Sequence, residues 1–173
     1  IYNLLKETDY EIISIDRLDY SGSYSRIQQI VEKNKSWSKR VRVVWRDLKA
    51  EINPLTVNRI NNPDVILHLA AASHVDRSIT DPMSFVLDNV VGTVNLLNYA
   101  RGLKKLEKFV YFSTDEVFGP APENIRYKEN DRYNSGNPYA ASKAGAEEMC
   151  VAFKNTYNMP IIITHTMNVF GER

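Results

Sequence analysis

The sequence predicts an α/β protein built as a Rossmann-like, doubly wound parallel sheet with helices on both faces. Short runs rich in Val and Ile alternate with longer segments that have helical periodicity, and this alternation is typical of such folds. The strand-like runs are largely apolar, as is expected of strands that are covered on both faces. No linker, low-complexity tract or internal repeat interrupts the pattern, so we expect residues 1–173 to form one domain.

Each element is predicted from its own local pattern. In chain order, the expected elements are a helix ending at Glu7, a strand at Ile12–Ile15, a helix at Ser23–Asn34, a strand at Val41–Trp45, a short helix at Asn53–Asn61, a strand at Asp64–Leu69, a long helix at Asp81–Gly102, a strand at Lys108–Ser113, a polar loop at Gly119–Gly136, a helix at Asn137–Tyr157 and a strand at Ile161–Thr166. Ile27 and Val31 share one face of the second helix. Proline follows a polar residue at Asn53, Asp81 and Asn137, which favours a capped helix start with proline in the first turn.

The charge balance argues against two classes of partner. Lys and Arg number 22 and Asp and Glu number 21, so the formal net charge is +1, and no basic block stands out. Nucleic acid is therefore not an expected partner. No apolar run reaches the length of a membrane span, so no membrane is expected either. Cys150 is the only cysteine, which leaves no internal disulfide or cysteine-based metal site and agrees with a cytoplasmic location.

The two ends of the sequence predict a piece of a longer protein. The chain begins at Ile1 with residues typical of the last turns of a helix, and a strand follows from Ile12. A dinucleotide-binding fold of this type starts with a strand and a loop before that helix. The strand at Ile161–Thr166 is followed by only a few residues. We therefore expect a fold that is truncated at both ends.

Two clusters of reactive side chains follow or lie on predicted elements. Thr114, Asp115 and Glu116 come directly after a strand, and the carboxyl ends of strands are where open α/β sheets build their sites. Tyr139 and Lys143 are four residues apart in a predicted helix, so they share one face about 6 Å apart along the axis. Each cluster also has an ordinary interpretation, a surface turn for the carboxylates and an amphipathic helix for the pair.

These residue types suit a redox enzyme that moves protons. A phenol has a pKa of about 10 and is a poor base at neutral pH, but a nearby ammonium and a positively charged nicotinamide favour the phenolate. Tyr139, with Lys143 beside it, can then take a proton from an alcohol while hydride leaves the same carbon. Thr114 can hydrogen-bond that oxygen. Asp115 and Glu116, if their environments differ, can divide acid and base duties.

Acidic residues after the first two predicted strands are candidates for a dinucleotide site. Asp16 can accept both hydroxyls of an adenosine ribose and would repel a 2′-phosphate, which favours NAD over NADP. A turn cap is an equally good interpretation of Asp16, and the adjacent Arg17 can accommodate that phosphate. Asp47 and Leu48 can hold the adenine by one polar and one apolar contact, although aspartate after a strand is also a common turn residue.

Small residues follow the third predicted strand, in the run Leu69-Ala70-Ala71-Ala72-Ser73-His74. Small side chains let a ligand approach the backbone closely, and they equally allow a strand and a helix to pack tightly. His74 is a candidate base, although a lone histidine is more often structural.

Together these motifs resemble the extended short-chain dehydrogenases/reductases and, among them, the dTDP-glucose 4,6-dehydratases. The resemblance runs from about Ile12 to Gly171. It rests on Asp16-Arg17-Leu18 with Gly22, Asp47-Leu48, His68-Leu69-Ala70-Ala71, Ser73-His74-Val75-Asp76-Arg77-Ser78, Asn89 with Gly92-Thr93, Ser113 to Gly119, Pro138-Tyr139 with Ser142-Lys143-Ala144, and Asn168 with Phe170-Gly171. The tyrosine–lysine pair is shared by the superfamily. The Thr-Asp-Glu triplet is more specific, because related epimerases and decarboxylases generally lack its two carboxylates.

The resemblance implies a partial NAD-binding domain over residues 1–173 and a nucleotide-sugar substrate. Ser73, Thr114 and Asn168 would bind the sugar. NAD would contact Asp16, Arg17, Leu18, Asp47, Leu48, Leu69, Ala70, Ala71, Tyr139 and Lys143.

The resemblance also implies a reaction and an assembly. Asp115, Glu116, Tyr139 and Lys143 would be the catalytic residues of a lyase that forms a 4-keto-6-deoxy sugar. The helices expected at Asp81–Gly102 and Asn137–Tyr157 are similar to the pair that forms a four-helix homodimer contact in this family.

Several positions depart from the family pattern. The glycine-rich phosphate loop before the first helix is absent, which removes backbone N–H groups from the pyrophosphate. Asp88 stands where a threonine is usual, Ala72 where a glutamate is frequent, His165 where an arginine is frequent and Val169 where an asparagine is frequent. The carboxy-terminal part of the family is also missing, so the 173-residue chain by itself is expected to be inactive.

Two alternatives stay open. A nucleotide-sugar epimerase or decarboxylase of the same superfamily would not need Asp115 and Glu116 together. A non-catalytic dinucleotide-binding fragment agrees with the absent glycine loop, but it has no use for Tyr139 and Lys143 in addition to both carboxylates. The sequence does not identify the base of the nucleotide.

Overall fold

The computed structural model describes residues 1–20 and 22–169, so Phe170 and Gly171 of the family motif lie outside the described residues. The chain divides into two compact units. The first comprises Ile1–Asp47 and Asn53–Asn61, and the second comprises Leu48–Ile52 and Asn62–Arg173. Each unit contains parallel strands and helices, as the α/β prediction requires.

The first unit contains a two-stranded parallel sheet. β1 (Ile12–Asp16) pairs with β2 (Val41–Trp45) along its whole length. The helices of this unit are α1 (Tyr2–Glu7), α2 (Tyr24–Lys33), the 3₁₀ helix η1 (Lys35–Lys39) and α3 (Pro54–Ile60). The Arg40 guanidinium donates to the carbonyl oxygens of Leu5 (3.2 Å) and Tyr10 (3.0 Å). This residue therefore joins the end of α1 to the segments that enter both strands.

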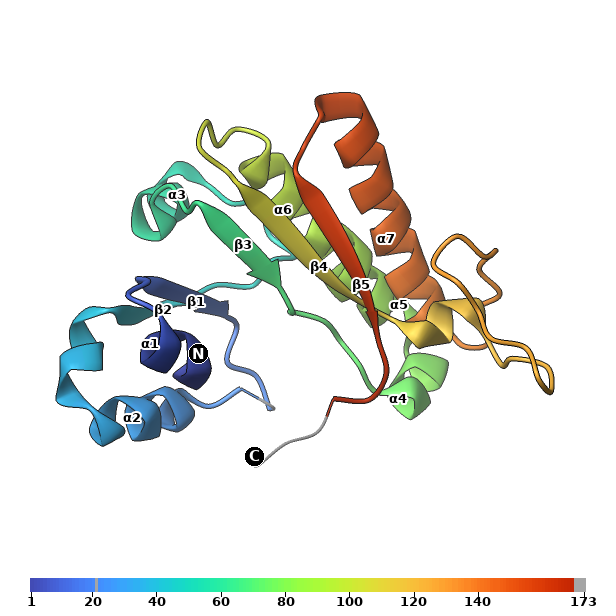
Figure 1. Ribbon diagram of the computed structural model, residues 1–173, viewed down its shortest axis with the longest axis horizontal. Coiled ribbons are helices and arrows are strands. Elements are labelled where there is room, and N and C mark those ends of the chain that lie inside the picture. The colour runs from blue at the N-terminus through green and yellow to red at the C-terminus, as the bar shows by residue number, and fades with distance from the viewer. Residues whose placement is uncertain (21, 170–173) are drawn as a thin grey trace. The chain divides into compact units, whose positions relative to one another are not determined.

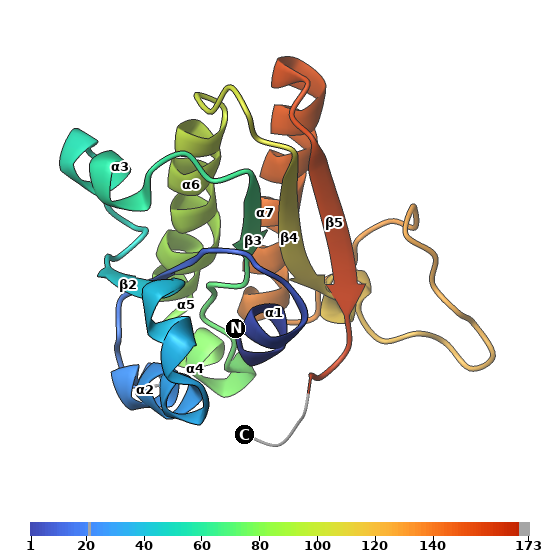
Figure 2. The same cartoon turned by 60° about the vertical axis from the view of Figure 1, so that its left-hand side comes forward.

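The second unit contains a three-stranded parallel sheet in the order β3-β4-β5. Its strands are β3 (Val65–His68), β4 (Lys108–Thr114) and β5 (Ile161–Thr166). Its helices are α4 (Val75–Thr80), α5 (Pro82–Phe85), the π-helix η2 (Val86–Val91), α6 (Gly92–Ala100), the 3₁₀ helix η3 (Asp115–Phe118) and α7 (Pro138–Tyr157). Helices α6 and α7 lie side by side against one face of this sheet (Figure 1), and a second view shows the same layer (Figure 2).

The core of the second unit lies between that face and the two helices. Phe109 and Tyr111 of β4 are at most 1% exposed, as are Leu97 of α6 and Cys150 of α7. Side chains alternate along a strand, so the same alternation that buries Phe109 and Tyr111 also buries Ser113. The core thereby fixes the end of β4, where the candidate site begins.

The helix starts expected before proline are confirmed. The side-chain oxygens of Asn53, Asp81 and Asn137 accept hydrogen bonds from the backbone N–H groups three residues on, at 2.9, 3.2 and 2.8 Å. All five expected strands are also present, with ends that differ by one residue at β1, β3 and β4. None of the helices in residues 1–20 and 22–169 is long and apolar enough to cross a membrane.

The long helix predicted over Asp81–Gly102 is present from Pro82 to Ala100, but it is not α-helical throughout. The structure has α5, then the π-helical stretch Val86–Val91, then α6. A π-turn adds a residue to the helical turn and is often found at functional sites. Its presence does not change the apolar character of the segment, so the sequence pattern does not reveal it. The short helices η1, α4 and η3 were not predicted either, because six residues or fewer carry too little periodicity.

Candidate active site

The end of β4 and the start of α7 bring the two predicted clusters together in the second unit. Thr114 is the last residue of β4, and Asp115 and Glu116 open η3 directly after it. Tyr139 and Lys143 lie in the first two turns of α7. Tyr139 lies close enough to Thr114, Asp115 and Glu116 for all three to affect its pKa.

Thr114 organises both carboxylate residues. Its side chain is buried, and its Oγ1 accepts a hydrogen bond from the Glu116 backbone N–H at 3.3 Å. The same hydroxyl lies 3.3 Å from Oδ1 of Asp115, to which it donates. A side-chain oxygen that binds the N–H two residues on is a helix N-cap, so Thr114 starts η3. Asp115 and Glu116 are therefore held on one short rigid turn, and both are only partly exposed.

The surroundings of Tyr139 keep its hydroxyl protonated. Burial raises the pKa of Tyr139, hydrogen bonding with the Thr114 side chain lowers it, and the charges of Glu116 and Asp115 raise it further. A raised pKa means that the phenol needs a nearby positive charge before it can act as a base. The ring packs edge-on against Phe85 of α5, with the centroids 6.4 Å apart.

Lys143 is a buried cation at the base of the site. It is 3% exposed, and its Nζ donates to the carbonyl oxygen of Phe112 at 2.6 Å. The ammonium also lies over the Tyr111 ring, 4.4 Å from its centroid, an arrangement that is favourable for a desolvated cation. Burial lowers the pKa of Lys143 to about 8. At neutral pH the side chain is therefore mostly charged.

Asn89 ties the loop after β3 to the helix that carries the pair, and the sequence reasoning did not assign it to the site. Its amide accepts from the Ala72 N–H (2.8 Å) and donates to the Ala72 carbonyl (3.0 Å) and to Ser142 Oγ (2.8 Å). Ser142 in turn donates to the carbonyl oxygen of Tyr139 at 2.7 Å. Asn89 belongs to one of the motifs that carry the family resemblance. Its hydrogen-bond partners are 17 and 53 residues away along the chain, so no local sequence pattern identifies them.

The predicted sugar-binding residues lie after neighbouring strands. Ser73 follows β3, Thr114 ends β4 and Asn168 follows β5, and the three strands are adjacent and parallel. Ser73 and Asn168 are exposed, whereas Thr114 is buried. His74 is exposed as well and occupies the N-cap position of α4 without a side-chain capping bond.

The predicted ribose-binding segment lies in the first unit, after β1. Asp16 is exposed and its Oδ1 accepts from the Leu18 N–H at 2.7 Å, so the turn-forming role is present. Arg17 donates to Asp19 at 2.6 Å and lies 3.9 Å from Asp47. A Cβ on Gly22 would lie 2.8 Å from Cα of Leu18, so the turn requires glycine there.

The remaining predicted cofactor residues lie in the second unit. Leu48 is half-buried and packs against the core of that unit. Leu69, Ala70 and Ala71 follow β3 and are exposed, with Leu69 at 61%. An exposed run of one leucine and two alanines leaves the backbone accessible to a ligand.

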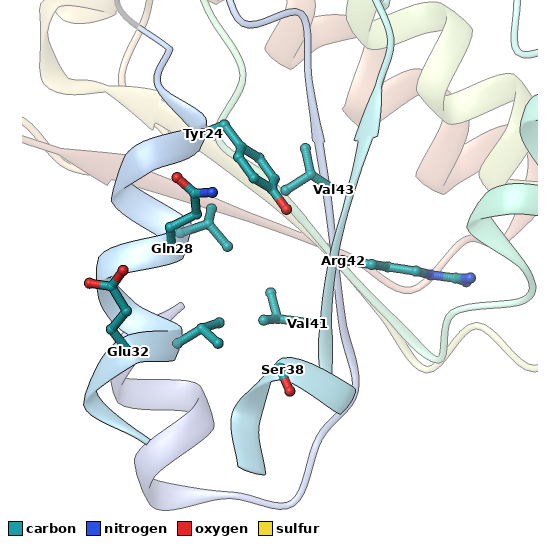
Figure 3. Close-up of a pocket in the computed structure, with 9 residues that line it drawn as sticks. Tyr24, Gln28, Glu32, Ser38, Val41, Arg42 and Val43 are labelled. Atoms are coloured by element: carbon teal, nitrogen blue, oxygen red, sulfur yellow. The ribbon is translucent and has the colours of Figure 1, made fainter. Parts of the chain in front are cut away.

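A surface pocket in the first unit contains none of the predicted site residues. It lies between α2 and β2, with Tyr24, Gln28 and Glu32 along the helix, and the Arg42 side chain points away from that helix (Figure 3). Its lining is completed by Ile27, Val31, Ser38, Val41 and Val43. The pocket is an incompletely filled gap between a helix and a strand, and we assign it no role.

Comparisons with known proteins identify the relatives of this chain. A family model described as GDP-mannose 4,6 dehydratase matches residues 1–173. The dTDP-glucose 4,6-dehydratase of Salmonella typhimurium is 33% identical over 99% of this chain and 51% of its own length. The low-salt glycan biosynthesis protein Agl12 of Haloferax volcanii is 35% identical over 98% of this chain and 52% of its own. The chain thus spans about half the length of the curated relatives it matches.

Solved structures show the same fold. The dTDP-glucose 4,6-dehydratase DesIV of Streptomyces venezuelae, solved as a double mutant with NAD and DAU bound, superposes with a TM-score of 0.83 at 32% identity, over 94% of this chain and 49% of that one. A UDP-Glc/GlcNAc 4-epimerase from Campylobacter jejuni has a TM-score of 0.80 at 25% identity, over 94% and 47%.

Fold and site together define a Rossmann-like α/β protein of the extended short-chain dehydrogenase/reductase class. Parallel strands, a tyrosine–lysine pair on α7 and a carboxylate pair after β4 are its features. Within that class, the chain belongs to the GDP-mannose 4,6-dehydratase family, whose model matches it from end to end.

Proposed function

We propose that the protein converts a nucleotide-glucose to its 4-keto-6-deoxy derivative, as a dTDP-glucose 4,6-dehydratase-like lyase. The observation that carries this proposal is the pair Asp115 and Glu116, held by Thr114 next to Tyr139. Oxidation alone needs only the tyrosine and the lysine. Removal of water from a sugar also needs one group that takes a proton from carbon and one that gives a proton to the departing hydroxyl.

The roles follow from the chemistry of each group. Tyr139, favoured as a phenolate by the Lys143 ammonium, takes the proton of the sugar 4-hydroxyl. The resulting ketone acidifies the C5 proton, which Glu116 removes, while Asp115 gives a proton to the 6-hydroxyl so that water leaves. A bound NAD would supply the hydride acceptor for C4 and the hydride donor for C6, and so would be regenerated. Glu116 would return the proton to C5 as hydride reaches C6. Thr114 and Ser73 orient the sugar.

The proposed cofactor is a nicotinamide dinucleotide, with proposed contacts at strand ends in each of the two units. The turn after β1 closes around Gly22, where a Cβ would lie 3.1 Å from Asp16 Oδ1, so this turn has room for backbone only. Asp16 would hold the ribose, beside Arg17 and Leu18. Leu69, Ala70 and Ala71 would lie along the cofactor, and Asp47 and Leu48 would contact the adenine. Structures of DesIV and of a Bacillus cereus epimerase have been solved with NAD.

The direct test of the proposed function is product formation. Full-length protein is incubated with NAD and with the glucose conjugates of dTDP, UDP, GDP and CDP in parallel, and the 4-keto-6-deoxy product is identified by mass spectrometry. Loss of one water without net consumption of NAD is expected with one of the four. Conversion to the 4-epimer instead would support the alternative function, which the C. jejuni neighbour represents.

The cofactor prediction concerns Asp16. We expect full-length protein to bind NAD more tightly than NADP, because a carboxylate at the ribose repels a 2′-phosphate. Asp16→Ala should reduce that preference, whereas Asp9→Ala, which removes an exposed carboxylate from the same unit, should leave it unchanged. Titration with both cofactors measures the two affinities. Tighter binding of NADP by the unmodified protein would show that the assignment of Asp16 is wrong.

We also propose a homodimer and a cytoplasmic location. Large apolar side chains are exposed on the helical segments expected at the dimer contact, including Met83 at 63% and Leu87 at 40%. Sedimentation at micromolar concentration should show a dimer, and Leu87→Glu should convert it to a monomer. Leu55→Glu, at a 74% exposed leucine of α3, should not. A monomer in the unmodified full-length protein would contradict the proposal.

A further inference from the structure

We propose that Asn137 is a positioning residue for Glu116. One side chain caps the helix that carries Tyr139 and Lys143 and also holds the carboxylate that removes the C5 proton. The inference rests on the proposed function, and it adds a residue that couples the oxidation site to the elimination site.

The two ends of the Asn137 amide have different partners. Its Oδ1 accepts a hydrogen bond from the Ala140 N–H at 2.8 Å, and its Nδ2 donates to Glu116 Oε2 at 3.1 Å. The partners fix the orientation of the amide, since a backbone N–H requires an acceptor and a carboxylate requires a donor. The reverse orientation would lose both bonds, so the assignment does not depend on distinguishing nitrogen from oxygen.

The loop between η3 and α7 brings these residues together. Its end folds back on η3, where the Asn134 N–H (2.9 Å) and Ser135 Oγ (3.3 Å) both donate to the carbonyl oxygen of Val117. Gly119 makes the close approach possible. Its φ is +73°, and a Cβ there would lie 2.2 Å from the Asn134 carbonyl oxygen. These two hydrogen bonds to Val117, the residue after Glu116, hold the end of the loop near Glu116.

This arrangement gives the two halves of the reaction one rigid frame. The amide occupies one oxygen of Glu116 and leaves the carboxylate to present its other oxygen to a substrate. Because the same amide caps α7, the distance from Glu116 to the Tyr139 helix cannot change without loss of a hydrogen bond. A misplacement of about 1 Å can reduce a catalysed rate by about a hundredfold, so such a tie is expected to matter for the elimination step.

Two substitutions separate the capping role from the positioning role. Serine and aspartate are as good as asparagine at the N-cap, so Asn137→Ser and Asn137→Asp should keep α7 intact. Neither supplies the amide donor, and the aspartate adds a carboxylate that faces Glu116. We expect turnover to fall about tenfold with serine and further with aspartate.

Asn53 provides the matched control. It also precedes a proline and caps its helix, α3, through Oδ1 at 2.9 Å from the Thr56 N–H. Asn53→Ser and Asn53→Asp therefore make the same exchange of caps in the first unit. The unfolding midpoints of all four variants should stay close to that of the unmodified protein, and turnover should fall only in the two Asn137 variants.

The absorbance of reduced nicotinamide during turnover distinguishes a positioning role from a purely structural one, because a purely structural role would not change it. If Asn137 positions Glu116, the oxidation step proceeds and reduced nicotinamide accumulates in both Asn137 variants. Wild-type turnover in both variants, or slow turnover without accumulation, would overturn the proposal.

A second measurement separates this inference from the proposed function. In ¹⁵N-labelled free protein, Glu116→Gln should shift the side-chain amide signals of Asn137. Glu148→Gln, at an exposed position of α7, should leave those signals unchanged. Unmoved Asn137 signals in Glu116→Gln would overturn the contact itself. If no nucleotide-glucose is dehydrated by the unmodified protein, the proposed function fails, while the amide signals still test the contact.

Discussion

Glu116→Gln is expected to stop the reaction after the sugar has been oxidised. The glutamine is almost isosteric with the glutamate and can keep the hydrogen bond from Asn137 Nδ2, which is 3.1 Å long in the structure, because its amide oxygen is an acceptor. It cannot accept the C5 proton. Product formation should fall by about a hundredfold or more, the usual contribution of a general base, and reduced nicotinamide should accumulate on the enzyme.

Asp115→Asn should also block the elimination, by preventing protonation of the departing hydroxyl. The asparagine cannot give a proton to the departing hydroxyl, although its oxygen can still accept the hydrogen bond that Thr114 now donates to Asp115 at 3.3 Å. Glu148→Gln serves as the control, since Glu148 is exposed on α7. Both reactions are followed by mass spectrometry and by near-ultraviolet absorbance. Wild-type turnover in Asp115→Asn and in Glu116→Gln would exclude the dehydratase and favour an epimerase.

The order of elements could be predicted because each element has a local cause. The strands at Val41–Trp45 and Ile161–Thr166 have the predicted bounds, since their β-branched and apolar residues satisfy the parallel sheet without distant information. The helix starts at Asn53, Asp81 and Asn137 are also local, as one side chain closes the first turn. The alternation of side chains along β4 then determines which of its residues are buried against the helices.

What the sequence could not supply depends on contacts between distant segments. The π-helical stretch at Val86–Val91 places Asn89 against Ala72 and Ser142, and neither contact has a sequence period. The bond from Asn137 to Glu116 crosses 21 residues, and it forms only because the loop closes at Gly119. The prediction therefore identified reactive residue types, while the residues that hold them required the folded chain.

The family resemblance and the geometry of the site support different parts of the proposal. A tyrosine–lysine pair is common to the superfamily, so it defines the class but not the reaction. The geometry adds that Thr114 contacts Tyr139, Asp115 and Glu116 together. One hydroxyl thus lies beside the group proposed to start oxidation and the two groups proposed for elimination.

Tyr139→Phe is expected to impair oxidation itself, with a loss of about a hundredfold or more. The ring can keep its edge-on contact with Phe85 at 6.4 Å, so the fold should survive, but no group is left to take the proton of the 4-hydroxyl. Reduced nicotinamide should not accumulate, which is the opposite of the result expected for Glu116→Gln. Tyr157→Phe, at a 47% exposed tyrosine at the end of α7, should turn over normally.

The pH dependence of the oxidation step should carry the signature of both members of the pair. Burial raises the pKa of Tyr139, so the fraction of phenolate, and with it the rate, should rise with pH. Burial lowers the pKa of Lys143 to about 8, so above that pH the ammonium loses the charge that favours the phenolate and the rise should end. Single-turnover rates measured from pH 6 to pH 10, roughly two units on either side of that value, test this. A Tyr139→Phe variant that kept both the wild-type rate and its pH profile would show that another group takes the proton.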